Sequence, residues 1–332
     1  MLAIILAAGL IAQSSSQVNS KKQGRFVAIA FNDNKAAYSE DGINWKTTTL
    51  PYDAYWGNIC YGNGKFVAAS WAYELDDGIT WSYKAVCSTD GINWEASTLP
   101  YEAPWHSVCY GNGKFVTVAN YSNIAAYSTD GINWNETTLP DEAEWRNVFY
   151  GNGKFVAIAN SRVAYSNDGI NWTASTLPLP GKIRWADICY GNRKFIAIAF
   201  DSNKAAYSAD GIKWYLTKVP SKISWTSWRS VCYGNGKFVA VASNCNEGTG
   251  CEDSNKAAYS EDGIRWKPAI LPYEASWKSV CYGDGKFVAI SSDYRDKNKA
   301  AYSEDGIKWK PAILPTLQDN QARWKSVCYG GD

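Results

Sequence analysis

The chain is built from short runs in which apolar and polar residues alternate, and helical spacing is absent. In the stretch 105–140 four such runs follow one another: Ser107 to Tyr110, Lys114 to Ala119, Ala125 to Ser128, and Asn133 to Leu139. Val, Ile, Tyr, Phe and Thr dominate these runs, as is typical of half-buried β-strands. The pattern therefore predicts four strands and no helix in this stretch.

Two turn sequences separate the predicted strands. Gly111-Asn112-Gly113 lies between the first and second strands, and an Asn-Gly turn suits a tight hairpin because both residues accept positive backbone angles. Ser128-Thr129-Asp130-Gly131 lies between the third and fourth strands. There the Asp can bond to its own backbone and the Gly can adopt the left-handed conformation. Both turns predict hairpins inside one four-stranded unit.

This four-stranded unit recurs along the chain. The Trp of its DGxxW element occurs seven times, about 38 to 52 residues apart, at Trp45, Trp94, Trp134, Trp172, Trp214, Trp266 and Trp309. A period of about 40–50 residues with several short strands is typical of propeller blades, whereas helical and leucine-rich repeats are shorter. The sequence therefore predicts an all-β, seven-bladed β-propeller over residues 24–332, with four antiparallel strands in each blade.

The two ends of the chain predict how the ring closes. The repeat begins at its second strand, in Gly24 to Phe31, and the segment Trp324 to Gly330 supplies a first strand with no second strand after it. Joining the two ends completes the first blade. Such closure removes the exposed strand edges that would otherwise promote aggregation.

The turn before each repeated Trp carries a family resemblance. The run from Ser128 to Trp134, with its six counterparts, resembles the Asp box S-x-D-x-G-x-x-W of sialidase-type (BNR-repeat) propellers, in a form one residue shorter between Asp and Gly. The resemblance implies a structural role, away from the ligand site, for Asp41, Asp90, Asp130, Asp168, Asp210, Asp262 and Asp305. Propellers of this pattern also occur in bacterial surface proteins, phage tail proteins and glycan-binding modules, so the fold does not choose the activity.

Composition excludes several classes of function. With 33 basic and 32 acidic residues the formal charge is +1, which gives no electrostatic case for a nucleic-acid partner. His106 is the only histidine, so Ser-His-Asp, Cys-His and multi-histidine metal sites cannot form, and we expect no metal and no cofactor. The arginines show no pattern that marks the triad of a sialidase. The chain is therefore expected not to be an enzyme, with a sialidase-type glycosidase as the remaining catalytic alternative.

The tryptophans and cysteines are interpreted mainly as packing residues. Of the 17 Trp, 14 occupy two repeated positions. One repeated first-strand position holds Cys in six copies and Phe149 in the seventh, which predicts a small buried apolar residue: Cys60, Cys109, Cys189, Cys232, Cys281 and Cys328. Cys245 and Cys251 flank a short loop in an insertion, so they are expected to form a local disulfide if the compartment is oxidising.

The N-terminal residues 1–23 leave two interpretations open. Leu2 to Ala12 form an apolar run followed by a polar, Ser-rich segment, which resembles a signal peptide, and the run is too short to span a bilayer. No Lys or Arg precedes it, and no clean A-x-A cleavage site follows. The alternative is an ordered extension. We expect an extracellular or virion or cell-surface location, with a cytoplasmic location as the alternative.

The connections between the second and third strands, and between one unit and the next, vary from copy to copy. In an up-and-down blade these connections emerge on one face, which we call the variable face, and loops on a rigid scaffold carry function. Its candidate ligand-binding aromatics are Trp71, Tyr73, Trp225, Tyr52, Tyr55, Tyr101, Tyr273 and Tyr294. Flat apolar rings beside polar groups suit sugars or protein partners. Alternatively, the tyrosines only cover the loop ends.

One further repeated position gathers positive charge. The residue after each first-strand Trp, here called the collar, is Gly57, His106, Arg146, Ala186, Arg229, Lys278 or Lys325. If the collar lies near the mouth of the central channel, it can bind an anion such as an acidic sugar through Arg146, Arg229, Lys278 and Lys325. Alternatively, these cations pair with nearby acidic residues, an arrangement that contributes little at a surface.

These observations together predict a non-catalytic recognition module that binds a glycan or a cell-surface protein through the variable face. The alternative is a protein–protein interaction scaffold, for example a phage tail or surface-assembly component. No transmembrane span is expected.

Overall fold

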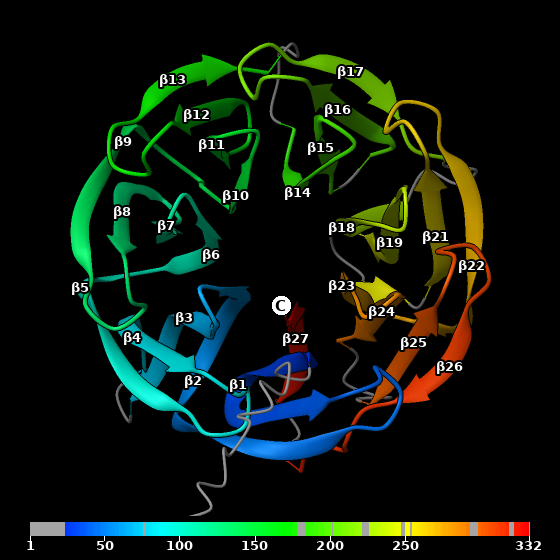
Figure 1. The fold of residues 1–332 in the computed structure, drawn as a ribbon, viewed down its shortest axis with the longest axis horizontal. Helices are drawn as coiled ribbons and strands as arrows, with labels where there is room; N and C mark the ends of the chain where they lie inside the picture. Colours follow the sequence, from blue (N-terminus) through cyan, green and yellow to red (C-terminus); the bar gives the residue numbers. More distant parts are fainter. Residues whose placement is uncertain are drawn as a thin grey trace, which may run out of the picture.

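The computed structural model describes residues 24–75, 78–177, 183–200, 202–220, 226–246, 250–252, 254–292, 298–318 and 322–331. Every regular element in this part of the chain is a β-strand, which confirms the all-β prediction. The strands form sheets arranged radially around a central axis, with the last strand beside the first (Figure 1). The expectations for residues 1–23 lie outside the described residues.

The strands are connected by hydrogen bonds into six sheets, each antiparallel throughout. The largest has the order β27 (Arg323–Gly330), β1 (Arg25–Ser39), β2 (Lys46–Gly62), β3 (Lys65–Leu75), β4 (Gly78–Ser88), β5 (Glu95–Ala103). Two more are β6 (Trp105–Gly111), β7 (Lys114–Ala119), β8 (Ser122–Ser128), β9 (Asn135–Ala143), and β10 (Asn147–Gly151), β11 (Lys154–Ile158), β12 (Arg162–Ser166), β13 (Thr173–Thr176).

The remaining sheets continue around the ring. They are β14 (Trp185–Gly191), β15 (Lys194–Ala199), β16 (Lys204–Ser208), β17 (Tyr215–Lys218); then β18 (Thr226–Gly234), β19 (Lys237–Asn246), β21 (Ser254–Ser260), β22 (Lys267–Ala275), with β20 (Gly250–Glu252) paired to β19; then β23 (Trp277–Gly283), β24 (Lys286–Ser291), β25 (Lys299–Ser303), β26 (Lys310–Ile313). In the stretch 105–140 the predicted strands agree with β6 to β9 within a few residues.

The prediction of seven separate four-stranded blades is wrong. Counting each hydrogen-bonded sheet as one blade, the propeller has six, and the six-stranded sheet holds two copies of the sequence repeat. The two copies merge because β2 runs through their junction: residues 46–49, 54 and 55 pair with β1, and residues 55, 56 and 59–62 pair with β3. At the next junction Pro104 separates β5 from β6, since proline has no N–H to continue a ladder.

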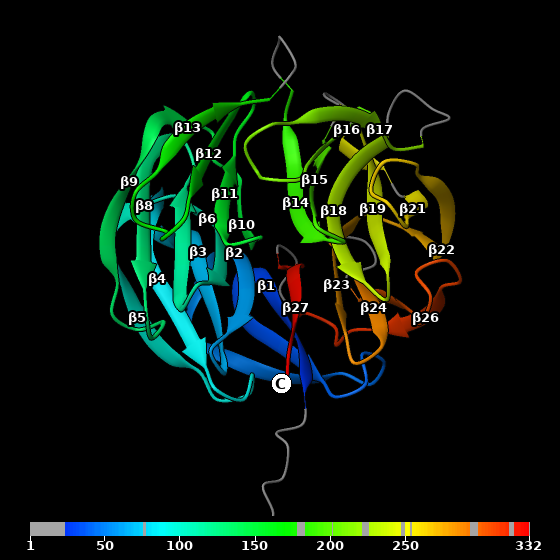
Figure 2. The same ribbon diagram turned by 45° about the horizontal axis from the view of Figure 1, so that its top comes forward.

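The two ends of the chain close the ring. Strand β27 pairs with the first half of β1 over its whole length, from Arg25 opposite Gly330 to Phe31 opposite Arg323. Figure 2 shows β27 and β1 side by side from a second direction. The predicted pairing between the two ends of the chain is therefore present, and the innermost strand of this sheet is supplied by the C-terminal segment.

Aromatic residues pack the units against one another. The first-strand tryptophans are almost fully buried: Trp56, Trp105, Trp145, Trp185, Trp228, Trp277 and Trp324. At the other end of the same strand, the tyrosine of each unit covers the last glycine of the preceding one. A Cβ placed on Gly111 would lie 1.9 Å from Cγ of Tyr150, and one on Gly151 would lie 2.2 Å from Cγ of Tyr190. Glycine is required at these positions because no side chain fits under the ring.

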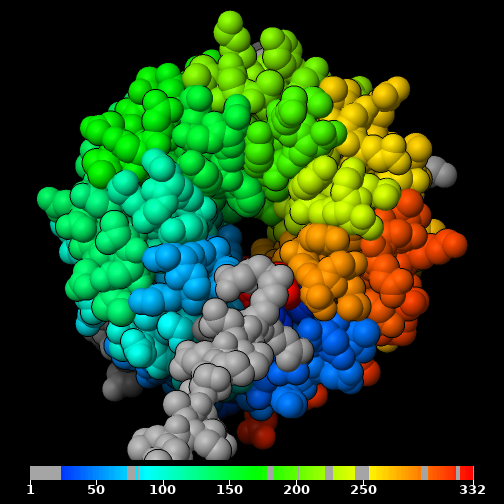
Figure 3. All heavy atoms as spheres, viewed as in Figure 1, coloured from blue at the N-terminus to red at the C-terminus, as the bar shows by residue number. Residues whose placement is uncertain are grey.

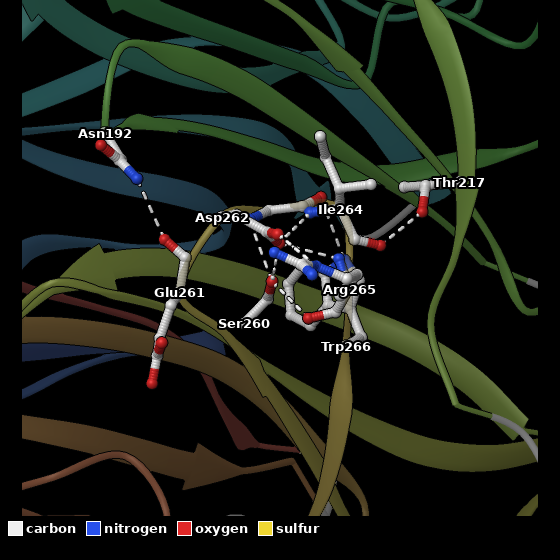
Figure 4. A network of polar contacts seen from close by, with 9 residues as sticks. Asn192, Thr217, Ser260, Glu261, Asp262, Ile264, Arg265 and Trp266 are labelled. Carbon is white, nitrogen blue, oxygen red and sulfur yellow. Dashed lines mark hydrogen bonds and ion pairs between the residues drawn. The ribbon is translucent and has the colours of Figure 1, made fainter.

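The Asp turns are closed by hydrogen bonds within each turn, as Figure 4 shows for the turn between β21 and β22. Asp262 Oδ1 accepts hydrogen bonds from the backbone N–H groups of Ile264 at 2.9 Å and Arg265 at 2.8 Å. In the other turns, too, the Asp Oδ1 accepts hydrogen bonds from the backbone N–H groups of the second and third residues after it: Asp41, Asp90, Asp130, Asp168, Asp210 and Asp305. The carboxylates are therefore engaged locally.

The same turns also join neighbouring sheets. The side-chain amide of Asn192, from the turn between β14 and β15, donates to the Glu261 carbonyl at 3.0 Å. The hydroxyl of Thr217 on β17 donates to the Ile264 carbonyl at 2.6 Å. The turns therefore help to hold the ring together on the face opposite the variable face.

Candidate functional site: the central channel and its mouth

The first strands of all the repeat copies surround a central channel, visible as a hollow at the centre of Figure 3. Its inner chamber, of about 330 Å³, is lined by the Val or Ile, Cys and Tyr positions of these strands. Toward the variable face the channel continues into a smaller hollow of about 90 Å³ with a polar lining. The inner chamber thus has a mixed polar and apolar lining, and the smaller hollow adds charged side chains.

The collar lines this smaller hollow. Gly57, His106, Ala186, Arg229, Lys278 and Lys325 all face it, and Arg146 lines the adjoining pocket on the variable face. In five copies the ladder between the first and second strands skips the collar residue: His106, Ala186, Arg229, Lys278 and Lys325. Such a residue is the extra one of a β-bulge, and bulges re-aim side chains next to functional sites.

In all but one copy the next residue of the first strand also lines the channel: Asn58, Asn147, Asp187, Ser230, Ser279 and Ser326. Together with their buried counterpart Ser107, these residues form a second layer, here called the polar ring. Several contacts in this layer join one unit to the next. The Val148 N–H donates to Ser107 Oγ at 3.3 Å, and the Val280 N–H donates to Ser230 Oγ at 3.2 Å. The polar ring therefore holds the first strands in a fixed arrangement around the channel.

The collar cations differ in how they are neutralised. Arg146 forms an ion pair with Glu144 at 3.1 Å. Arg229 donates to the Ser243 hydroxyl at 2.6 Å, and its guanidinium lies 3.9 Å from the centroid of the Phe200 ring. A cation over an aromatic face is stabilised without losing its charge. The predicted pairing of collar cations with acidic residues is therefore observed for Arg146.

Lys278 and Lys325 have no acidic partner in the described part of the chain. Burial lowers the pKa of Lys278 well below its usual value, and repulsion from Lys325 and Arg229 lowers it further. Burial, followed by repulsion from neighbouring arginines, lowers the pKa of Lys325 to about 8. Burial and repulsion between neighbouring cations thus both disfavour the charged form of these lysines.

Asp187 is the one carboxylate among the residues described as lining this hollow. Its Oδ2 accepts a hydrogen bond from the Val231 N–H at 2.9 Å, and its Oδ1 accepts one from the Ile188 N–H at 2.9 Å. Burial raises its pKa to about 6, although these hydrogen bonds and the charge of Lys278 act in the opposite direction. The sequence reasoning missed Asp187. An alignment of the repeat copies distinguishes Asp187, because the other copies carry an uncharged Ser or Asn at this position.

His106 is held as a neutral ring. Its Nδ1 lies 2.7 Å from the Arg146 carbonyl oxygen. Burial lowers the pKa of His106 to about 3, and the charges of Lys325 and Arg146 contribute to this shift. The only histidine of the chain therefore contributes no positive charge to the collar near neutral pH.

A pocket of about 230 Å³ adjoins the collar on the variable face. It is lined by Phe31, Gly57, Trp71, His106, Asn120, Tyr121, Arg146 and Lys325. Tyr121 is 59% exposed and has a positive φ of 55°, which is unusual for an aromatic residue. Buried Asn120 supports it by accepting a hydrogen bond from the Tyr121 N–H at 3.1 Å. The pocket thus combines aromatic faces with cations, and the sequence reasoning did not single out Phe31 or Tyr121.

The other aromatics expected at the site lie apart from this pocket or beneath it. Tyr55 is buried, with its ring between Phe31 at 4.8 Å and Trp71 at 6.2 Å. The Tyr52 ring lies 5.0 Å from Lys84 Nζ, so it stacks within its own sheet. Tyr101 and Tyr273 are not among the residues that line the pocket. Their backbone carbonyls accept hydrogen bonds from the side chains of first-strand tryptophans. Trp225, Tyr294 and the side chain of Tyr73 lie outside the described residues.

The cysteines lie mostly along the channel. Cys60, Cys109, Cys189, Cys232, Cys281 and Cys328 line the inner chamber as free thiols, and burial raises their pKa values. They are therefore protonated at neutral pH. Cys245 and Cys251 are paired positions on adjacent strands β19 and β20. Their disulfide stays a prediction, because their side chains lie outside the described residues.

The described residues offer neither a metal-binding cluster nor a membrane-spanning helix. No group of three or more His, Cys, Asp or Glu side chains there is arranged to hold a metal ion. No helix in the same part of the chain is long and apolar enough to cross a membrane.

Comparison with known proteins identifies the fold. No protein-family description and no curated protein sequence matches the chain. Among solved structures, virginiamycin B lyase from Staphylococcus aureus superposes with a TM-score of 0.64 at 15% identity, over 80% of this chain and 85% of that one. YCF48 bound to D1 peptide superposes with a TM-score of 0.56 at 14% identity, over 79% of this chain and 82% of that one.

A streptogramin B lyase structure matches similarly, with a TM-score of 0.63 at 13% identity, over 77% of this chain and 83% of that one. At such low identities the likeness shows the fold alone. The chain is thus a β-propeller whose fold is shared by an enzyme and by a peptide-binding protein.

Proposed function

We propose that the protein is a non-catalytic scaffold that binds an extended segment of a protein partner on its variable face. The observation that carries the proposal is the pocket in which Phe31, Trp71 and Tyr121 lie beside Arg146 and Lys325. Aromatic and arginine side chains supply most of the energy in protein–protein contacts, because they bury a large apolar area and still form hydrogen bonds.

The conformation of Tyr121 supports the same proposal. A positive φ costs a non-glycine residue about 1–2 kcal/mol, and here it holds an aromatic ring in solvent instead of packing it. Backbone strain of this kind concentrates at ligand-binding positions. The propeller that carries a bound D1 peptide shows that this fold can present a peptide-binding surface.

Lyase chemistry is not proposed for this chain, although two of the structures with a similar fold are lyases. His106 is the only histidine, and its Nδ1 is engaged by the Arg146 carbonyl. Its low pKa of about 3 makes it a weak base at neutral pH. These features favour binding over proton transfer at the channel mouth.

A peptide display library and a glycan array, both probed with the purified protein, test the proposal. We expect peptides to be enriched, and we expect the double variant Trp71→Ala/Tyr121→Ala to bind them at least about tenfold more weakly, equivalent to about 1.4 kcal/mol. The matched control is Tyr215→Ala, because Tyr215 is similarly exposed but lies on the outer strand β17. Glycan binding that depends on Trp71 and Tyr121, without peptide enrichment, would replace this proposal with the glycan alternative.

A further inference from the structure

The collar and the pocket on the variable face form one continuous path into the channel. Gly57, His106 and Lys325 line both the pocket and the smaller hollow. The hollow in turn shares its polar-ring residues with the inner chamber. A partner bound in the pocket therefore has a charged group of this protein directly beside it and a polar cavity beyond that group.

The collar has an excess of positive charge. Among the collar cations, Arg146 has the acidic partner Glu144, whereas Lys278 and Lys325 have none in the described part of the chain. Asp187, the carboxylate lining the same hollow, is already engaged by two backbone N–H groups. Amines brought together inside a cavity repel one another, and a bound anion removes this repulsion.

The hydrogen-bonding character of the hollow also favours an anion. Lys278, Lys325 and Arg229 supply N–H donors that line the hollow. Oxygen atoms of an anion accept charge-assisted hydrogen bonds from such groups, which are stronger than neutral ones. The volume of about 90 Å³ suits a small group with few non-hydrogen atoms.

We propose that the collar is a carboxylate-binding site, in which Lys278, Lys325 and Arg229 hold a carboxylate of the partner that occupies the neighbouring pocket. This inference rests on the proposed function and adds the chemical class of the group that enters the channel. The carboxylate comes either from the free C-terminus of the partner segment or from an acidic side chain within it. The bulges fix the collar side chains toward the channel before any ligand arrives, which reduces the entropy lost on binding.

The collar is tested first with acetate alone, titrated into the full-length protein against equal concentrations of chloride. We expect acetate to bind and to raise the melting temperature more than chloride does. The variants Lys278→Met and Lys325→Met should each weaken acetate binding at least tenfold. Both variants are expected to stay folded, because each removes one of two mutually repelling amines. Lys310→Met is the matched control, since Lys310 lies on the exposed strand β26 beside Glu304.

The second experiment uses a peptide enriched from the display library. Its native form is compared with a form that has an amidated C-terminus and with forms in which each acidic residue in turn is replaced by its amide. We expect one amide form to bind at least tenfold more weakly, and the form affected identifies the source of the carboxylate. Lys278→Met should abolish the difference between acid and amide. Undiminished binding of all the amide forms, together with no acetate binding, would overturn the collar proposal while leaving the scaffold function intact. Acetate binding through Lys278 without any selectable peptide would overturn the scaffold function and leave the collar.

Discussion

Tyr61 lies across Gly330, so a ring near the start of the chain covers the last glycine of the closing strand. A Cβ placed on Gly330 would come within 2.3 Å of Cδ2 of Tyr61. The residues are 269 positions apart in the sequence, since 330 minus 61 is 269. The ring is therefore closed by side-chain packing between the units that contain its two ends, as well as by the β1–β27 ladder.

Deletion of residues 324–332 should open the propeller. The shortened chain loses β27, which leaves the inner edge of β1 unpaired and exposes Phe26 and Val27, both fully buried in the intact protein. Unpaired edges promote aggregation, and each unit of a repeat protein depends on its neighbours. We expect aggregation or a much lower melting temperature, measured by size-exclusion chromatography and thermal unfolding. A monomeric variant with an unchanged melting temperature would contradict the closure described here.

The Tyr-over-Gly contact predicts a specific coupling. Gly111→Ala should lower the free energy of unfolding by about 1–3 kcal/mol, as other substitutions that overpack a core do, because the new methyl group meets the Tyr150 ring. In a Tyr150→Ala background the added cost should largely disappear, which a double-mutant cycle of unfolding measurements detects.

Gly113→Ala serves as the control for this cycle. Gly113 has a positive φ of 74° and open space around it, so its substitution costs backbone strain alone. That cost should be the same with and without the Tyr150 ring. Equal coupling for both glycines would refute the packing explanation.

The Asp turns predict acid sensitivity. Burial alone would raise the pKa of Asp41 and Asp90, but hydrogen bonds from backbone N–H groups outweigh it and lower both to about 2. A carboxyl whose pKa is lower in the folded state stabilises the protein above its unfolded pKa of about 3.9, and this contribution is lost as the pH falls toward the folded value. The free energy of unfolding should therefore fall between about pH 4 and pH 2.

Urea unfolding at a series of pH values measures this loss. Asp130→Asn should be less stable at pH 5 and should show a shallower decline, because one contributing carboxylate is absent. The range below pH 4 is used because Asp187, with a folded pKa of about 6, gives the opposite slope between pH 4 and 6. A stability that stays constant from pH 4 to pH 2 would show that the turns do not depend on ionised aspartate.

Acetate affinity at the collar should fall as the pH rises, with one decrease from Asp187 and one from Lys325, besides the loss of charge at Lys278, whose pKa lies well below its usual value. The groups that face the site are Arg146, Arg229, Lys278, Lys325, Arg323, Asp187 and His106. Asp187 ionises near pH 6 and adds a negative charge close to Lys278, and Lys325 loses its positive charge near pH 8. His106 stays neutral across this range because its pKa is about 3.

Calorimetric titration from pH 5 to pH 9 measures these decreases. Asp187→Asn should remove the decrease near pH 6, and Lys325→Met should remove the decrease near pH 8. An affinity that rises with pH, or a profile that neither variant changes, would contradict the assignment of these groups to the site.

The sequence alone determined the strands, the turns and the pairing of the two ends. Alternation of apolar and polar residues specifies strands locally, and the Asn-Gly and Asp-Gly turns specify hairpins, since both effects act between residues close in the chain. Recurrence of the unit then predicted a ring, and the split unit predicted that the segment 324–330 would join the segment 24–31, as β27 and β1 do. The burial of the first-strand tryptophans also followed from their repetition.

Only the tertiary structure decided how the copies combine and what faces the channel. Strand β2 pairs with β1 on one side and with β3 on the other, so two copies share one sheet, and this depends on pairing between Phe31 and Tyr55 that no local pattern specifies. The bulge at Lys278 turns adjacent residues of one strand toward the channel, against the simple alternation that the sequence predicts. The charge of the collar and the altered pKa of Asp187 arise from burial among units distant in sequence, so they exist only once the ring has closed.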